Sequence, residues 1–119
     1  MIENNILAEK SFAFALRCIK LNKFLTEEKR EFVMSKQILR SGTSIGANIK
    51  ESMYAQSKAD FGSKLSIAKK EAGETEYWLE LLKASEYIET KLAESLIIDC
   101  KELLRMLISS TKTVYQSKS

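Results

Sequence analysis

The most constraining feature of this 119-residue sequence is that it contains no proline, where ordinary usage would place roughly six. Proline interrupts helices because it lacks an amide hydrogen and its ring clashes with the preceding turn. The four glycines lie inside stretches where apolar residues recur every three or four positions. We therefore predict one all-α domain over residues 1–119, an antiparallel up-down-up-down four-helix bundle with a single core.

The first helix is predicted over residues 5–23. At about 100° of rotation per residue, one line holds Leu7, Phe14, Cys18 and Leu21. The residues beside that line are Ala8, Phe12, Ala15 and Ile19. This apolar arc covers well over half of the circumference, which is more than a bundle core requires. We expect the first helix to bury two faces.

The second helix is predicted over residues 33–56. Its start is expected between Thr26 and Met34, with Thr26 as an N-cap ahead of Glu27 and Glu28. Segment 41–47 has poor helix propensity, since each glycine costs about 1 kcal/mol, and a loop that splits the helix is the alternative. Because the apolar phase is the same on both sides, we favour a continuous helix. Its core stripe is Met34, Ile38, Ser41, Ile45, Ile49, Ser52 and Gln56.

The third helix is predicted over residues 58–85, with Ser57 and Asp60 forming an acidic variant of the capping box. Its core face is predicted to contain Phe61, Leu65, Ala68, Ala72, Thr75 and Leu79. A second line, about 100° away, holds Ile67, Glu71 and Trp78.

The fourth helix is predicted over residues 91–114, with Thr90 as its cap. Its core line is predicted to be Leu92, Leu96, Cys100, Leu103 and Leu107. The Ser/Lys-rich tail from about Tyr115 is expected to fray. Cys18 and Cys100 each lie on an apolar stripe, which favours reduced, buried thiols over a disulfide or metal ligands.

The residues that catalysis usually requires are missing from the sequence. There is no histidine, no glycine-rich phosphate loop and no G-x-S-x-G elbow. Glu71, Glu74 and Glu76 have no histidine to complete a Glu-x-x-His metal site, so we interpret them as surface ion-pairing residues. We expect a protein that is not an enzyme and that uses no cofactor and no metal.

The location of the protein is also an expectation from the sequence. No apolar run approaches the roughly 20 residues of a membrane span, and the start MIENNILAEK lacks the pattern of a signal peptide. We expect a cytoplasmic protein without membrane contact.

The net charge of +3 does not by itself indicate nucleic acid, but residues 1–56 hold nine Lys/Arg against six Asp/Glu.

One face of the second helix carries small side chains between two charged ones. Arg40, Ser44, Ala47 and Glu51 fall within about 60° of one another, opposite the core stripe. This is either an ordinary solvated face or a surface where another helix or subunit approaches closely, since small side chains permit tight backbone contact.

The run QILRSGTSIGANIKES, followed by SKADFGSKLSIAKKEAGETEYWLELL, resembles the signature of bacterial four-helix-bundle proteins encoded in intervening sequences of 23S rRNA genes. That family is similar to the accessory variability determinant of diversity-generating retroelements. The matching positions are Gln37, Arg40, Ser41, Ser44, Ile45, Asn48, Glu51, Asp60, Phe61, Leu65, Ala68 and Glu71. The resemblance implies a ring-like homo-oligomer, expected to be a pentamer, and in the retroelement branch it implies reverse transcriptase and nucleic acid as partners.

Two functional hypotheses follow. The first is a non-enzymatic, oligomeric accessory protein that associates with RNA or DNA, with candidate contacts at Arg17, Lys20, Lys36 and Lys50. The second is a homo-oligomeric scaffold that binds another protein, such as a reverse transcriptase, without contacting nucleic acid. The candidate interface residues for subunits or partners are Arg40, Ser44, Ala47, Asn48, Glu51, Ile67, Glu71 and Trp78.

Overall fold

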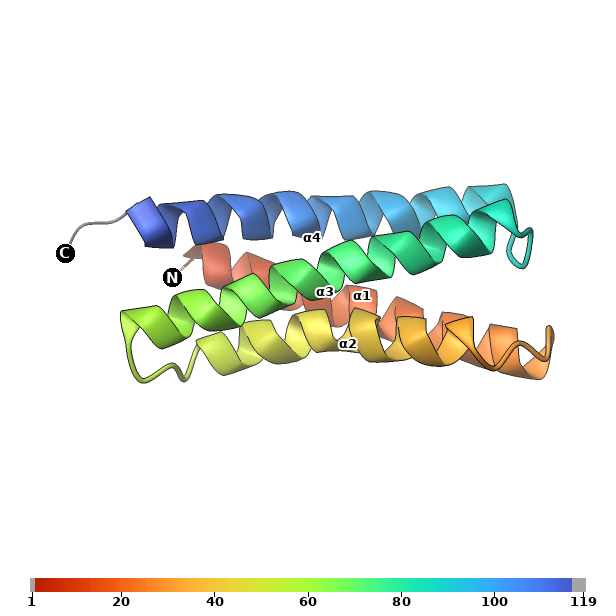
Figure 1. The fold of residues 1–119 in the computed structure, drawn as a ribbon, viewed down its shortest axis with the longest axis horizontal. Helices are drawn as coiled ribbons and strands as arrows, with labels where there is room; N and C mark the ends of the chain where they lie inside the picture. Colours follow the sequence, from red (N-terminus) through yellow and green to blue (C-terminus); the bar gives the residue numbers. More distant parts are fainter. Residues whose placement is uncertain (1, 117–119) are drawn as a thin grey trace.

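A computed structural model describes residues 2–116 and confirms the all-α class. Its four helices are α1 (Ile2–Glu27), α2 (Met34–Ser52), α3 (Lys58–Ala84) and α4 (Thr90–Gln116). Each helix packs against the next in the chain, and α1 also contacts α4, so the four form an elongated up-down bundle (Figure 1). The contact between α1 and α4 is the least extensive of the four.

The core follows the predicted apolar lines closely. The α2 stripe is buried from Ile38 to Ser52, and the α3 face is buried from Leu65 to Leu79. Two predicted core residues are exposed: Gln56 lies beyond the end of α2, and Leu92 lies in the first turn of α4, where it is 39% exposed. Both lie at helix ends, where fewer neighbouring side chains are available to cover them.

The second helix is continuous through its two glycines, as predicted. Gly42 faces the buried side chain of Cys18, and a Cβ at this position would overlap the sulfur. Gly46 faces Ser11, whose backbone oxygen would lie 3.5 Å from such a Cβ. The glycines that lower helix propensity therefore allow α1 and α2 to approach closely.

The prediction that Thr26 caps α2 is wrong. Thr26 is still part of α1, and its hydroxyl lies 2.9 Å from the Asn22 carbonyl oxygen. The carboxylate of Glu31 instead accepts hydrogen bonds from the backbone amides of Val33, Met34 and Ser35, at 3.2, 3.0 and 2.8 Å. These amides have no partner within the helix, so a negative side chain at this end stabilises α2.

The remaining helix ends differ from the prediction by a few residues. Ser57 caps α3 as predicted, with its hydroxyl accepting from the Asp60 amide at 3.0 Å. The second helix ends at Ser52 rather than 56, and Thr90 is the first residue of α4 rather than its cap. Tyr115, predicted to fray, is helical, and residues 117–119 of the tail lie outside the described residues.

The first helix buries only one face within this chain. Leu7, Phe14, Cys18, Leu21 and Leu25 are buried, as expected for a line facing the core. On the outer side Phe12 is 67% exposed, Leu16 48% and Ile19 42%. The second apolar face predicted from the sequence is therefore present, but within the described residues it stays largely exposed rather than buried.

Candidate interaction surfaces

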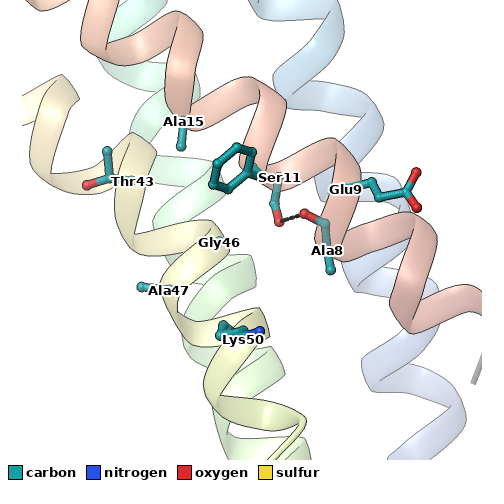
Figure 2. A pocket seen from close by; sticks show the side chains of 9 residues that line it. Ala8, Glu9, Ser11, Ala15, Thr43, Gly46, Ala47 and Lys50 are labelled. Carbon is teal, nitrogen blue, oxygen red and sulfur yellow. Dashed lines mark hydrogen bonds between the residues drawn. The ribbon is translucent and has the colours of Figure 1, made fainter.

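An open groove of about 660 Å³ runs between α1 and α2. Its residues from α1 are Ala8, Glu9, Ser11, Phe12 and Ala15, and those from α2 are Thr43, Gly46, Ala47 and Lys50 (Figure 2). Small side chains form most of this lining, which leaves the backbones of the two helices close to the surface. Phe12 lines the groove with an exposed ring, and Leu16 and Ile19 are exposed further along α1. The groove and these apolar side chains together are called here the α1–α2 face.

Apart from the exposed carboxylate of Glu9, the few polar groups of the α1–α2 face are already engaged. The hydroxyl of Ser11 donates to the Ala8 carbonyl oxygen at 3.1 Å (Figure 2). The hydroxyl of Thr43 donates in the same way to the Leu39 carbonyl oxygen at 2.7 Å. The ammonium group of Lys50 lies 5.9 Å from the centre of the Tyr54 ring. The groove therefore favours an apolar contact over a polar ligand.

A polar network joins α2 to α3. The Arg40 guanidinium donates from Nη2 to Oε2 of Glu74 at 2.6 Å and from Nη1 to Oε2 of Glu71 at 3.3 Å. The Trp78 indole N–H donates to the same Glu74 oxygen at 3.0 Å. The hydrogen bonds from Trp78 and Arg40 lower the pKa of Glu74, and those to Glu74 and Glu71 raise the pKa of Arg40.

The network continues into the core through two hydroxyl groups. The Thr75 hydroxyl lies 2.8 Å from the Ser41 hydroxyl and 2.8 Å from the Glu71 carbonyl oxygen. Oxygen Oε1 of Glu71 is buried without a hydrogen bond, although it lies 3.3 Å from Nη1 of Arg40. Buried polar groups of this kind fix the rotation of two helices relative to each other, because a shift would leave them unpaired.

The structure does not bring the predicted interface residues together at one place. Arg40, Glu71 and Trp78 come together around Glu74, which the sequence indicated only as an ion-pairing residue. The other residues on this side of α2 also make contacts within the chain: Glu51 pairs with Lys64 at 3.0 Å, and Asn48 donates to the Ser44 carbonyl oxygen at 2.8 Å. Ala47 lines the groove instead, and Ile67 is 39% exposed on α3.

The four candidate nucleic-acid contacts are not gathered at one place. Arg17 pairs with Asp99 of α4 at 2.7 Å, and Lys50 lies at the groove. Lys20 and Lys36 are both exposed near the connection between α1 and α2. Sequence reasoning did not single out Lys23, Lys29 and Arg30, which lie between Lys20 and Lys36 in the sequence. It also missed Thr43 and Gly46 as groove residues, because their position depends on which helix lies beside α2.

The two cysteines are buried and are not joined in a disulfide. Burial raises the pKa of the Cys18 thiol and of the Cys100 thiol to about 12, so neither is a reactive thiolate at neutral pH.

Within residues 2–116, no three His, Cys, Asp or Glu side chains are grouped closely enough to hold a metal ion. None of the helices in the described part of the chain is both long and apolar enough to cross a membrane.

Comparison with known proteins identifies the family. No curated protein sequence matches the chain. A solved structure from Bacteroides thetaiotaomicron, a protein of unknown function from the S23 ribosomal protein family, is 58% identical and has a TM-score of 0.91; the match covers 92% of this chain and 98% of that one. Residues 3–109 match the family described as 23S rRNA-intervening sequence protein. The chain therefore belongs to the 23S rRNA-intervening sequence protein family.

Proposed function

We propose that this protein is a non-catalytic, self-assembling accessory protein whose assembled form associates with nucleic acid. The observation that carries the assembly is the α1–α2 face, where Phe12, Leu16 and Ile19 stay exposed beside an apolar groove. Exposed apolar surface of this kind marks contacts between proteins. A second copy of the same chain is the proposed partner, in a ring-like homo-oligomer of five subunits.

Light scattering coupled to size exclusion tests the assembly. We expect a mass that is a multiple of 13.5 kDa and is maintained at micromolar concentrations. A mass of 13.5 kDa at every concentration would overturn the assembly, whereas two to four subunits would contradict only the pentamer.

The nucleic-acid role is supported by the charge of the first half of the chain and by the family's link to 23S rRNA genes. One copy with net charge +3 would bind a polyanion weakly. A ring repeats the same cations on every subunit, so one strand meets several sites and the overall affinity rises. Binding should then fall steeply between about 50 and 200 mM salt.

The second candidate is a scaffold that binds another protein, such as a reverse transcriptase. It is favoured by the ion pairs that already engage Arg17 with Asp99 and Arg40 with Glu74. Fluorescence anisotropy with labelled RNA and DNA separates the two candidates. If the intact oligomer binds neither at low salt, the nucleic-acid role is wrong and the scaffold is favoured.

A further inference from the structure

The connection between α1 and α2, together with the helix ends beside it, carries five cations that form no ion pair within the described part of the chain. We call this surface the basic corner: Lys20, Lys23, Lys29, Arg30 and Lys36. All five are exposed, and none forms an ion pair with a described residue. Elsewhere on the bundle, the cations that pair with acids include Lys10, Arg17, Arg40, Lys64, Lys83 and Lys101. Cations without an ion pair to a described residue also occur there, but they are spread over α2, α3 and α4: Lys50, Lys69, Lys70, Lys91, Arg105 and Lys112.

The acidic residues of the same segment do not cancel this charge. Glu31 is buried, and its carboxylate is occupied by three amides of α2. Glu27 and Glu28 are the exposed acids of this segment, and five cations less three acids, Glu31 included, leave an excess of two. Glu86 and Glu89, at the same end of the bundle, belong to the α3–α4 connection (Figure 1).

A contact between the two helices brings the corner together. Asn22 of α1 donates from Nδ2 to the Ser35 carbonyl oxygen of α2 at 3.1 Å. The next residues in the chain are Lys23 and Lys36, so these two exposed lysines flank a direct contact between the helices. From Lys20 to Glu27 the helix rises about 10 Å, so the cations span a short stretch along the bundle axis. Lys20 lies on the side of α1 that faces Leu92 and Leu96 of α4.

Two aromatic rings lie among these cations. Phe32 is 58% exposed in the connection, and Phe24 at the end of α1 has the Lys29 ammonium group 5.8 Å from its ring centre. The backbone next to Phe32 is held by hydrogen bonds: the Glu31 amide donates to the Leu25 carbonyl oxygen at 2.9 Å while its carboxylate caps α2. The backbone that carries the exposed ring is therefore ordered by its neighbours, which lowers the entropy cost of binding.

We propose that the basic corner binds single-stranded nucleic acid, with the cations contacting phosphates and Phe32 stacking on a base. This inference rests on the proposed nucleic-acid role and names its site and the form of its ligand. Single strands offer free base faces to an aromatic ring, whereas a duplex hides them. The ring favours nucleic acid over an acidic protein, which would use the cations without needing a stacking surface.

The corner is compatible with the proposed assembly. The α1–α2 face covers residues 8–19 of α1, and the corner begins with the next residue, Lys20. The two surfaces are adjacent along α1 without sharing residues. In a ring of parallel subunits the corner would repeat around one rim, where a single strand could follow it.

Fluorescence anisotropy of the intact protein tests the inference, with labelled oligouridine, oligothymidine and the duplex of oligothymidine with oligoadenosine as probes. At low salt, Lys23→Glu with Lys36→Glu should weaken single-strand binding at least about tenfold. The matched control, Arg105→Glu with Lys112→Glu, makes the same charge change at exposed positions of α4 far from that end of the bundle and should leave binding within about twofold. Circular dichroism and light scattering confirm that fold and mass are unchanged.

The aromatic contact is tested separately. Phe32→Ala should weaken single-strand binding at least about fivefold, Phe32→Trp should retain it, and Val33→Ala, a change at the neighbouring exposed residue, should have little effect. If the protein binds nucleic acid but the corner variants do not differ from the controls, the site is wrong and the proposed function stands. Equal binding of duplex with no effect of Phe32→Ala would overturn the single-strand assignment. Binding of poly-glutamate but no nucleic acid, or of neither, would overturn both the inference and the nucleic-acid role.

Discussion

The Arg40 guanidinium donates to the Glu74 carboxylate at 2.6 Å, and this ion pair spans the seam between α2 and α3. Arg40 lies within the motif that carries the family resemblance, and it is one of the candidate interface residues for subunits or partners. Its side chain instead has partners in its own chain, Glu71 and Glu74. A contact of Arg40 with another subunit would have to be made in addition to these ion pairs or in exchange for them.

The hydrogen bonds that Glu74 accepts from Trp78 and Arg40 should make stability depend on pH in the acidic range. The pKa of Glu74 is lowered from 4.5 in the folded protein, so its contribution is present above 4.5 and is lost as pH falls through the folded pKa. Glu74→Gln should lower the free energy of unfolding at pH 7 by at most about 1 kcal/mol, because the side chain is partly exposed. The difference from the parent should shrink as the pH falls below 4.5. Urea unfolding followed by circular dichroism measures the difference at each pH.

Glu80→Gln is the matched control for that measurement. It removes the same charge from an exposed position of α3 that has no ion pair with a described residue. An equal loss of stability in both variants would mean that general charge, rather than the pair with Arg40, accounts for the effect.

Two glycines should respond to alanine in opposite directions. At Gly42 a Cβ would overlap the sulfur of the buried Cys18, so Gly42→Ala should destabilise the bundle by about 1–3 kcal/mol. At Gly73 a Cβ would meet nothing within 4 Å, so Gly73→Ala should stabilise α3 by about 1 kcal/mol. Thermal unfolding distinguishes the two. Adding Cys18→Ala to Gly42→Ala removes the sulfur and should restore part of the lost stability. If it does not, the clash with Cys18 is not the cause of the destabilisation.

The carboxylate of Glu31 should contribute measurably to stability. Glu31→Ala removes the acceptor of three backbone hydrogen bonds at the start of α2 and should cost about 1–2 kcal/mol. Glu28→Ala, at an exposed position three residues earlier, should change stability little. Chemical unfolding of both variants tests the assignment, and indistinguishable midpoints would contradict it.

Filling the groove should affect assembly more than folding. Ala47 is exposed and lines the groove, so Ala47→Trp should lower the oligomer mass while preserving the helical circular dichroism spectrum. Ala59→Trp adds the same ring at an exposed position of α3 outside the groove lining and should leave the mass unchanged. An oligomer mass that survives Ala47→Trp, or loss of the helices, would show that the groove is not the contact surface.

The sequence by itself determined the helices and the core. Ile38, Ile45 and Ile49 recur at helical spacing, and this period places them on one line whatever lies opposite. The Ser57 cap was also predictable, because its partner Asp60 is three residues away. These features depend on local geometry, so the order of the residues is sufficient to predict them.

The tertiary structure decided which surfaces remain open and which charges are paired. Phe14 and Phe12 lie on the two apolar faces that the sequence predicts for α1, yet only Phe14 is buried, because burial depends on where the neighbouring helices lie. Glu31 caps α2 in place of Thr26 because the connection brings its carboxylate against the amides of that helix. Arg40 finds its partners more than 30 positions further along the chain. Helical periodicity carries no information about such contacts, since they arise only when separate helices pack at a particular rotation and separation.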